Sequence, residues 1–139
     1  MIAAIVLVGG GLFLIVVLGI LAAIALPAYQ DYIIRSKVVA AHIEARGARV
    51  AVEEFVLNTD RCPRDADELQ LPPVSTPGVA MREIGEAHTG MCIIEVEMAG
   101  DFAGGRLAGQ RLRHSRDSAG DWYCTSGSID SKYLPADCR

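Results

Sequence analysis

The first thirty residues contain no Asp, Glu, Lys or Arg, and the first 26 are all apolar or Gly. An α-helix rises about 1.5 Å per residue, so a helix of this stretch is longer than the roughly 30 Å hydrocarbon core of a bilayer. A cleaved secretory signal is the alternative, because Ala23-Ile24-Ala25 provides a small-x-small sequence. A signal peptide, however, starts with basic residues and has an apolar core of only about 7–15 residues. We therefore expect residues 1–27 to anchor the chain in a membrane.

The charged residues, 13 basic and 17 acidic, all lie between Asp31 and the C-terminus. A chain of 139 residues has room for one domain, which excludes an enzyme with separate nucleotide and substrate domains. No group of residues has the pattern of a catalytic site, so we predict no enzyme activity, cofactor or metal ion. The three histidines, His42, His88 and His114, are dispersed, and we interpret them as surface or helix-face residues.

The cysteines form an even set outside the apolar segment: Cys62, Cys92, Cys124 and Cys138. This pattern in a small domain is typical of disulfides formed in an oxidising compartment. No CxxC pair and no His at metal-ligand spacing is present, so a zinc site would need ligands from distant loops. Reduced buried thiols are the other alternative to disulfides. Four cysteines allow three pairings. We favour Cys124–Cys138 with Cys62–Cys92, because the first bridge closes a loop of about 15 residues, worth about 3 kcal/mol in the chain-entropy model.

Two features of the sequence predict opposite orientations of the chain in the membrane. Basic residues follow the apolar segment and none precedes it, so the positive-inside rule places the C-terminal part in the cytoplasm. The cysteines favour the opposite, oxidising side.

Residues 28–57 are predicted to continue the helix with an amphipathic pattern. Apolar residues recur at alternating spacings of four and three, as on one face of a helix: Ile34, Val38, Ala41, Ala45, Ala48, Val52 and Phe55. Polar residues follow the same spacing on another face: Asp31, Arg35, His42, Arg46, Arg49 and Glu53. Pro27 lacks an N–H and predicts a kink or an unwound stretch between Gly19 and Pro27. Gly10, between Gly9 and Gly11, favours close approach of a neighbouring helix, with a helix break as the alternative.

The rest of the chain reads as an irregular connection followed by a sheet. Residues 58–78 are acidic and rich in proline. Residues 92–98 alternate between apolar and polar, which is typical of a strand with one face exposed to solvent. Weaker strand signals cover residues 79–84, 106–114 and 121–124, so residues 79–139 predict a small antiparallel meander with a C-terminal loop tied back by Cys138. We thus expect an α+β fold in which residues 28–139 form one globular domain.

Two motifs at opposite ends of the chain resemble type IV pilins. The run Leu18–Tyr32, LGILAAIALPAYQDY, followed by Arg35-Ser36-Lys37-Val38, is similar to the N-terminal helix of that family. Trp122-Tyr123-Cys124 and the ending Lys132–Arg139 resemble its disulfide-bounded C-terminal loop. The resemblance implies a long helix, half apolar and half amphipathic, packed on a four-stranded antiparallel sheet.

The same resemblance implies a function and its partners. The protein would be a structural subunit of a filament, used for surface adhesion, motility or DNA uptake. Its apolar half-helix would lie in the bacterial inner membrane, with the globular part in the periplasm, until the pilus assembly machinery adds it to an extracellular pilus of identical subunits. The alternative is a membrane-tethered pilin-like module that binds DNA or a surface without polymerising.

One position departs from the family pattern. Pilins carry a glutamate about seventeen residues before the helix proline, and counting back from Pro27 reaches Gly10. The family's basic leader before the mature N-terminus is also missing from the sequence, so processing by the prepilin peptidase stays open. Three interpretations follow: a filament subunit with an unusual N-terminus, a minor or tip pilin, or a pilin-like protein that stays in the membrane.

The segment 106–116 is the one strongly basic stretch. It contains four arginines and no acidic residue. We call Arg106, Arg111, Arg113 and Arg116 the arginine strip. We expect a solvated hairpin balanced by acidic residues of neighbouring subunits, with a nucleic-acid-binding strip as the alternative.

Overall fold

The computed structural model describes residues 2–87, 90–100 and 105–139, and within the first helix it describes side chains from residue 9 onward. The prediction for His88 lies outside the described residues. The backbone contacts divide the chain into two units, residues 1–33 and 34–139, which we describe separately.

The first unit is helical from residue 2 to its end. Helix α1 (Ile2–Thr59) begins here and is unbroken through the glycines and Pro27. The unwound stretch expected before Pro27 and the alternative of a break at Gly10 are therefore wrong. A helix proline removes a single backbone hydrogen bond, and the turns on either side keep theirs. By length and composition, the apolar part of α1 can cross a membrane.

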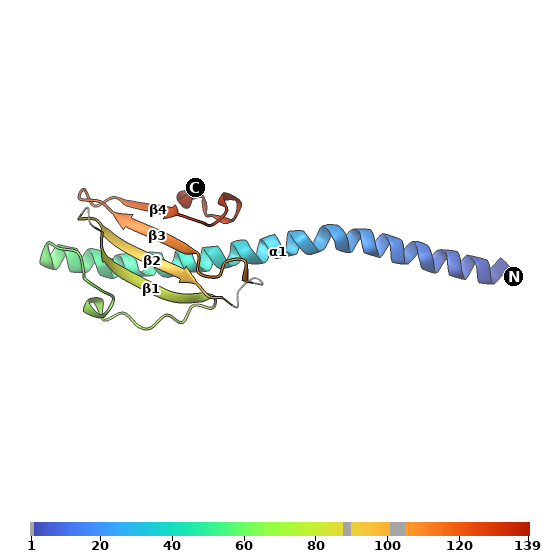
Figure 1. The fold of residues 1–139 in the computed structure, drawn as a ribbon, viewed down its shortest axis with the longest axis horizontal. Helices are drawn as coiled ribbons and strands as arrows, with labels where there is room; N and C mark the ends of the chain where they lie inside the picture. The colour runs from blue at the N-terminus through green and yellow to red at the C-terminus, as the bar shows by residue number, and fades with distance from the viewer. Residues whose placement is uncertain (1, 88–89, 101–104) are drawn as a thin grey trace. The chain divides into compact units, whose positions relative to one another are not determined.

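The second unit contains the four-stranded antiparallel sheet that the sequence predicts. Its strands are β1 (Val79–Glu86), β2 (Cys92–Met98), β3 (Arg111–Arg116) and β4 (Trp122–Ser126). Their order in the sheet follows their order in the chain, and all neighbours are antiparallel. The second half of α1 crosses one face of this sheet (Figure 1).

The core of this unit lies between that half of α1 and the sheet. Six of the seven predicted stripe residues are at most 2% exposed: Ile34, Val38, Ala41, Ala45, Ala48 and Val52. Phe55 is half-buried instead, and Arg61 lies over its ring at 4.8 Å. Val56 packs against the core in its place, because a period of 3.6 residues returns the core face to between these two positions after Val52.

Strands β1, β3 and β4 differ from their predicted boundaries, and β1 continues to Glu86, two residues beyond its predicted end. The predicted strand 106–114 begins only at Arg111, because Gly105 and Gly109 adopt positive φ angles of 79° and 68° and the residues between them form a turn. Positive φ is a conformation that glycine adopts without strain. Strand β4 ends at Ser126, two residues beyond the predicted end.

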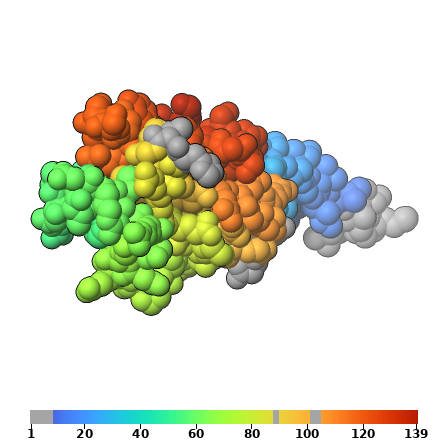
Figure 2. All heavy atoms as spheres, turned by 60° about the vertical axis from the view of Figure 1, so that its left-hand side comes forward, coloured from blue at the N-terminus to red at the C-terminus, as the bar shows by residue number. Residues whose placement is uncertain are grey.

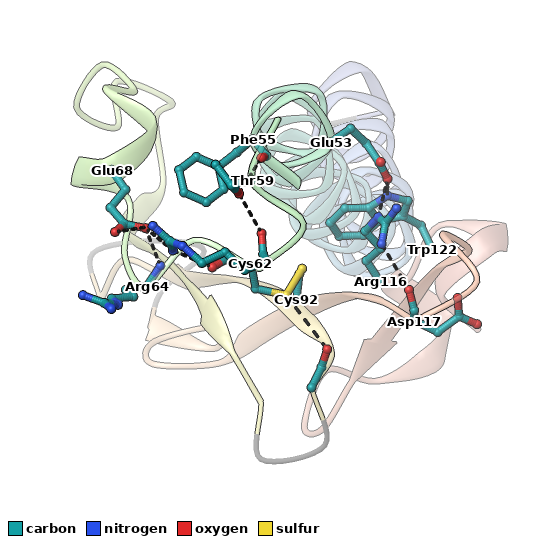
Figure 3. The surroundings of a disulfide bond; sticks show 12 residues. Glu53, Phe55, Thr59, Cys62, Arg64, Glu68, Cys92, Arg116, Asp117 and Trp122 are labelled. Atoms are coloured by element: carbon teal, nitrogen blue, oxygen red, sulfur yellow. Dashed lines mark hydrogen bonds and ion pairs between the residues drawn. A yellow bond between two sulfur atoms is a disulfide. The ribbon is translucent and has the colours of Figure 1, made fainter. Parts of the chain in front are cut away.

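The connection between α1 and β1 lies on the surface of the second unit, drawn in green and yellow-green in Figure 2. It contains one short 3₁₀ turn, η1 (Asp67–Leu69). A disulfide between Cys62 and Cys92 joins the connection to β2, and Figure 3 shows its surroundings.

The C-terminal segment after β4 contains two further 3₁₀ turns, η3 (Ser131–Tyr133) and η4 (Ala136–Cys138). A second disulfide, Cys124–Cys138, joins β4 to η4 and closes the C-terminal loop.

Candidate assembly surface, arginine strip and histidine cluster

From residue 9 to Tyr29, the surface of the first unit is apolar on all sides. Twelve large hydrophobic side chains there are more than half exposed in the single chain: Leu12, Phe13, Leu14, Ile15, Val16, Leu18, Ile20, Leu21, Ile24, Leu26, Tyr29 and Tyr32. The run of four from Leu12 to Ile15 covers more than one turn, so no side of the helix is polar there. A helix that is apolar all round requires lipid or protein around it. We call residues 9–32 the assembly surface.

Two positions of this surface leave room for a close neighbour. A Cβ atom built on Gly10 or Gly19 would meet no other side chain of the chain within 4 Å. Small residues on an apolar helix let a second backbone approach closely.

The arginine strip does not form one patch. In β3 the side chains alternate, so Arg111 and Arg113 lie on the outer face, and Leu112 and His114 are buried on the other. Arg116 belongs to the second face and reaches the helix. Arg106 precedes the strand and lies in the turn.

The two outer arginines are paired with carboxylates of the same sheet. Arg111 forms ion pairs with Glu97 at 2.7 Å and with Glu83 and Glu95 at 3.1 Å each. Arg113 pairs with Glu95. Hydrogen bonds that Arg111 donates to Glu97 and Glu95 raise its pKa. The balancing charges, expected from neighbouring subunits, are thus present within this chain.

Arg116 has its own acidic partner on α1. Its Nε donates to Glu53 Oε1 at 2.8 Å, and the Trp122 indole donates to the same oxygen at 2.6 Å (Figure 3). The hydrogen bond from Arg116 is the main cause of the lowered pKa of Glu53. This contact fixes the start of β4 to the helix.

A second ion pair holds the connection. Glu44 on α1 accepts hydrogen bonds from Arg82 of β1 and from Thr76. Arg82 also donates to the Pro72 carbonyl at 2.9 Å, and its side chain is only 7% exposed. The connection is therefore fastened to both α1 and the sheet.

Two of the histidines are buried and in contact, which contradicts their interpretation as surface residues. His114 is 0% and His42 5% exposed, and their Nε2 and Nδ1 atoms are 3.2 Å apart. His114 follows Leu112 by two residues in β3, so the strand alternation places it in the core. That alternation was a signal in the sequence. His42 follows the buried Ala41 on α1, at the edge of the apolar stripe.

The hydrogen bonds around the histidines run in one direction. Arg49 Nε donates to His114 Nδ1 at 2.8 Å, so that nitrogen accepts and the proton of His114 is assigned to Nε2. His114 Nε2 then donates to His42 Nδ1, and His42 Nε2 donates to Asp137 at 3.1 Å. The chain of bonds links a guanidinium to a carboxylate through two neutral imidazoles.

The protonation behaviour agrees with this arrangement. Burial, together with the positive charge of Arg49, lowers the pKa of His114 to about 3. Burial also lowers the pKa of His42, against the opposing effect of Asp137. Both imidazoles are neutral near pH 7.

The C-terminal disulfide lies against the histidine pair. Cys138 Sγ is 3.4 Å and Cys124 Sγ 4.0 Å from His42 Nδ1. We call His42, His114, Cys124 and Cys138 the histidine–cysteine cluster. The sequence pattern does not group these histidines with the cysteines, because the four residues come from α1, β3, β4 and η4.

Comparisons with known proteins agree with the fold. Residues 34–139 match the model of the Pilin family, described as a bacterial filament protein. The chain is 28% identical over 150 residues to a type IV major pilin protein PilE of Neisseria gonorrhoeae, covering 92% of this chain and 89% of that protein. It is 32% identical over 145 residues to fimbrial protein Q of Moraxella bovis, covering 92% of each. Fimbrial protein EcpC of Eikenella corrodens is 31% identical over 131 residues, covering 92% of this chain and 85% of that protein.

Proposed function

Because the chain belongs to the pilin family of bacterial filament proteins, we propose that it works as a structural subunit of a type IV pilus-like filament. Subunits are held together by the assembly surface, residues 9–32. The observation that carries this proposal is the exposure of twelve large apolar side chains on that surface.

The energetics favour polymerisation through this helix. Burying apolar surface stabilises by about 25 cal/mol per Å², so 300 Å² shared with one neighbour is worth roughly 7 kcal/mol relative to water. Lipid reduces the gain, because the side chains are already in an apolar environment before assembly. Identical subunits that contact one another head to tail without closing a ring form an open helical array.

Before assembly, the subunit resides in the inner membrane with its globular unit in the periplasm. The span of apolar residues and the two disulfides support this location. The partners are then other copies of the chain and a pilus assembly machinery in the membrane. After assembly, the globular units form the extracellular surface of the pilus, where they serve adhesion, motility or DNA uptake.

A tethered binding module that does not polymerise is the alternative function. Gly10 stands where the pilin family has a glutamate, so one charged contact between subunits is lacking. Its DNA-binding form has less support, because Arg111, Arg113 and Arg116 already contact carboxylates. The pilin family relationship favours a structural role over an enzymatic one.

Filaments sheared from the cell surface distinguish the filament subunit from the tethered module. We expect the chain in sheared filaments, identified by electron microscopy and mass spectrometry. Leu18→Arg should remove it from the filaments while leaving it in the membrane fraction. The matched control is Leu57→Arg, the same change at an exposed position of α1 outside the assembly surface, and it should still form filaments.

A second variant is needed in case the charged variant Leu18→Arg fails to insert into the membrane. Gly19→Leu keeps the helix apolar but fills the space that a neighbouring helix would occupy, and it should also reduce filament yield. Wild-type protein found solely in detergent-extracted membranes, or filaments unaffected by both Leu18→Arg and Gly19→Leu, would refute assembly through residues 9–32.

A further inference from the structure

We propose that the histidine–cysteine cluster, when the Cys124–Cys138 bridge is reduced, is a binding site for a zinc ion. Its four potential ligand atoms lie within 4.8 Å of one another. Among the residues that the structure describes, no other group of three or more His, Cys, Asp or Glu side chains meets this condition. Two thiolates with two imidazoles are a common ligand set of structural zinc sites.

The spacing of the ligand atoms matches a tetrahedral site. Zn–N distances of about 2.0–2.1 Å and Zn–S distances of about 2.3 Å place two nitrogens roughly 3.4 Å apart and a nitrogen and a sulfur roughly 3.6 Å apart. His42 Nδ1 lies 3.2 Å from His114 Nε2 and 3.4 Å from Cys138 Sγ. Binding requires the two sulfurs to separate to roughly 3.8 Å. It also requires the more distant ligand atoms, such as Cys124 Sγ at 4.0 Å from His42 Nδ1, to move closer to the metal.

The surroundings of His42 suit a metal ligand. When Nδ1 binds zinc, the proton stays on Nε2, which already donates to Asp137 at 3.1 Å. A carboxylate behind a metal-bound histidine fixes its tautomer and ring orientation. The cluster is also shielded from solvent, since His42, His114 and Cys138 are each at most 5% exposed.

Arg49 opposes binding at His114. Its Nε donates to His114 Nδ1, but that nitrogen must carry the proton once Nε2 binds zinc. The guanidinium must therefore turn away, and the Trp122 ring, 5.1 Å from it, offers another contact. This conflict makes a specific prediction: Arg49→Met should bind zinc more tightly than the wild type.

The chemistry balances with a dithiol as reductant. Two electrons from the dithiol break the S–S bond, two protons go to the cysteine sulfurs, and the dithiol leaves as a disulfide. Zinc then displaces the two thiol protons. Zn²⁺ with two thiolates and two neutral imidazoles has no net charge, which suits a buried site. Reoxidation of the cysteines releases the metal, so the bridge and the zinc site exclude each other.

Cobalt binding to the full chain in detergent tests the site. The chain is reduced under argon, the reductant is removed, and Co²⁺ is added as a spectroscopic probe for zinc. We expect one Co²⁺ per reduced chain, with tetrahedral ligand-field bands and a thiolate-to-metal charge-transfer band, both displaced by Zn²⁺. The oxidised chain should give neither band.

Variants assign the ligands. His42→Ala, His114→Ala and Cys124→Ser should abolish the tetrahedral spectrum, and Asp137→Asn should weaken binding about 10- to 100-fold. Two matched controls, Ile43→Ala and Arg113→Ala, change exposed residues that are adjacent in the sequence to His42 and His114. A third control, Cys62→Ser/Cys92→Ser, removes the other pair of thiols. These three should bind as the wild type does.

Two results would overturn the site. One is an octahedral or absent cobalt spectrum in a reduced chain whose Trp122 fluorescence shows that it is folded. The other result applies if the reduced chain unfolds. Zinc should then restore the fluorescence of the folded chain, and a reduced chain that stays unfolded in excess zinc contradicts the proposal.

Discussion

Acid is expected to destabilise the oxidised globular unit through His114 at a pH where most carboxylates are still ionised. In the folded chain the pKa of His114 is about 3, against 6.5 for the free side chain, because burial and Arg49 disfavour its charged form. A histidine whose pKa is depressed by folding contributes its full stabilisation above about pH 6.5 and loses it as the pH falls toward 3. His42, whose pKa is also lowered, acts in the same direction, whereas Asp137 opposes both.

The size of the effect follows from the two pKa values of His114. A pH of 5 is 1.5 units below the pKa of 6.5 of the unfolded histidine, which is therefore mostly protonated, whereas the folded histidine is still neutral. Each unit corresponds to about 1.4 kcal/mol, so His114 alone should lower the free energy of unfolding by about 2 kcal/mol between pH 7.5 and pH 5.

The assay is urea unfolding of the full oxidised chain in detergent with a chelator, followed by fluorescence of Trp122, the one tryptophan of the sequence. His114→Gln is the matched variant: its amide oxygen can accept from Arg49 and its amide N–H can donate to His42, but it does not titrate. The variant should lose about 2 kcal/mol of the pH dependence. Equal pH dependence of the two proteins between pH 7.5 and pH 5 would show that the buried histidine does not control acid stability.

Three further predictions concern stability and binding. Glu44→Gln should destabilise the globular unit by about 3–5 kcal/mol in the same assay, because it leaves Arg82 buried without a counter-charge; an effect below about 1 kcal/mol would contradict a buried ion pair. Cys124→Ser/Cys138→Ser should cost about 3 kcal/mol in the presence of chelator, as expected for a bridge between residues 14 apart; unchanged stability would mean that the loop is held by its other contacts. Arg111→Ala/Arg113→Ala/Arg116→Ala should leave DNA retention unchanged and insensitive to salt, because these arginines contact carboxylates; a loss of about one unit of salt slope per arginine would instead establish a DNA-binding strip.

Local periodicity predicts much of this fold. The uncharged first thirty residues and the spacing from Ile34 to Val52 define α1, since burial on one side of a helix leaves a repeat of 3.6 residues. Alternation in residues 92–98 defines β2, because its two faces have different surroundings. Glycine limits the reach of such patterns: the strand signal at Arg106 fails because Gly105 and Gly109 form a turn there.

The contacts of the site depend on pairings that periodicity does not contain. His42 and His114 are 72 residues apart, and their contact requires a particular placement of β3 on α1. The pairs Arg111–Glu97 and Arg113–Glu95 follow from the β2–β3 register, which sets these residues opposite one another. The charges were visible in the sequence, but a strand register is a property of the folded sheet.

The strand order has a consequence for how the globular unit folds. Each strand pairs with the strand synthesised just before it, so the sheet can grow one hairpin at a time without waiting for distant segments. β4 is the last strand to join, and Cys138 the last cysteine to become available. The terminal bridge can therefore close only after every strand of the sheet has been synthesised, so a closed bridge accompanies a complete globular unit.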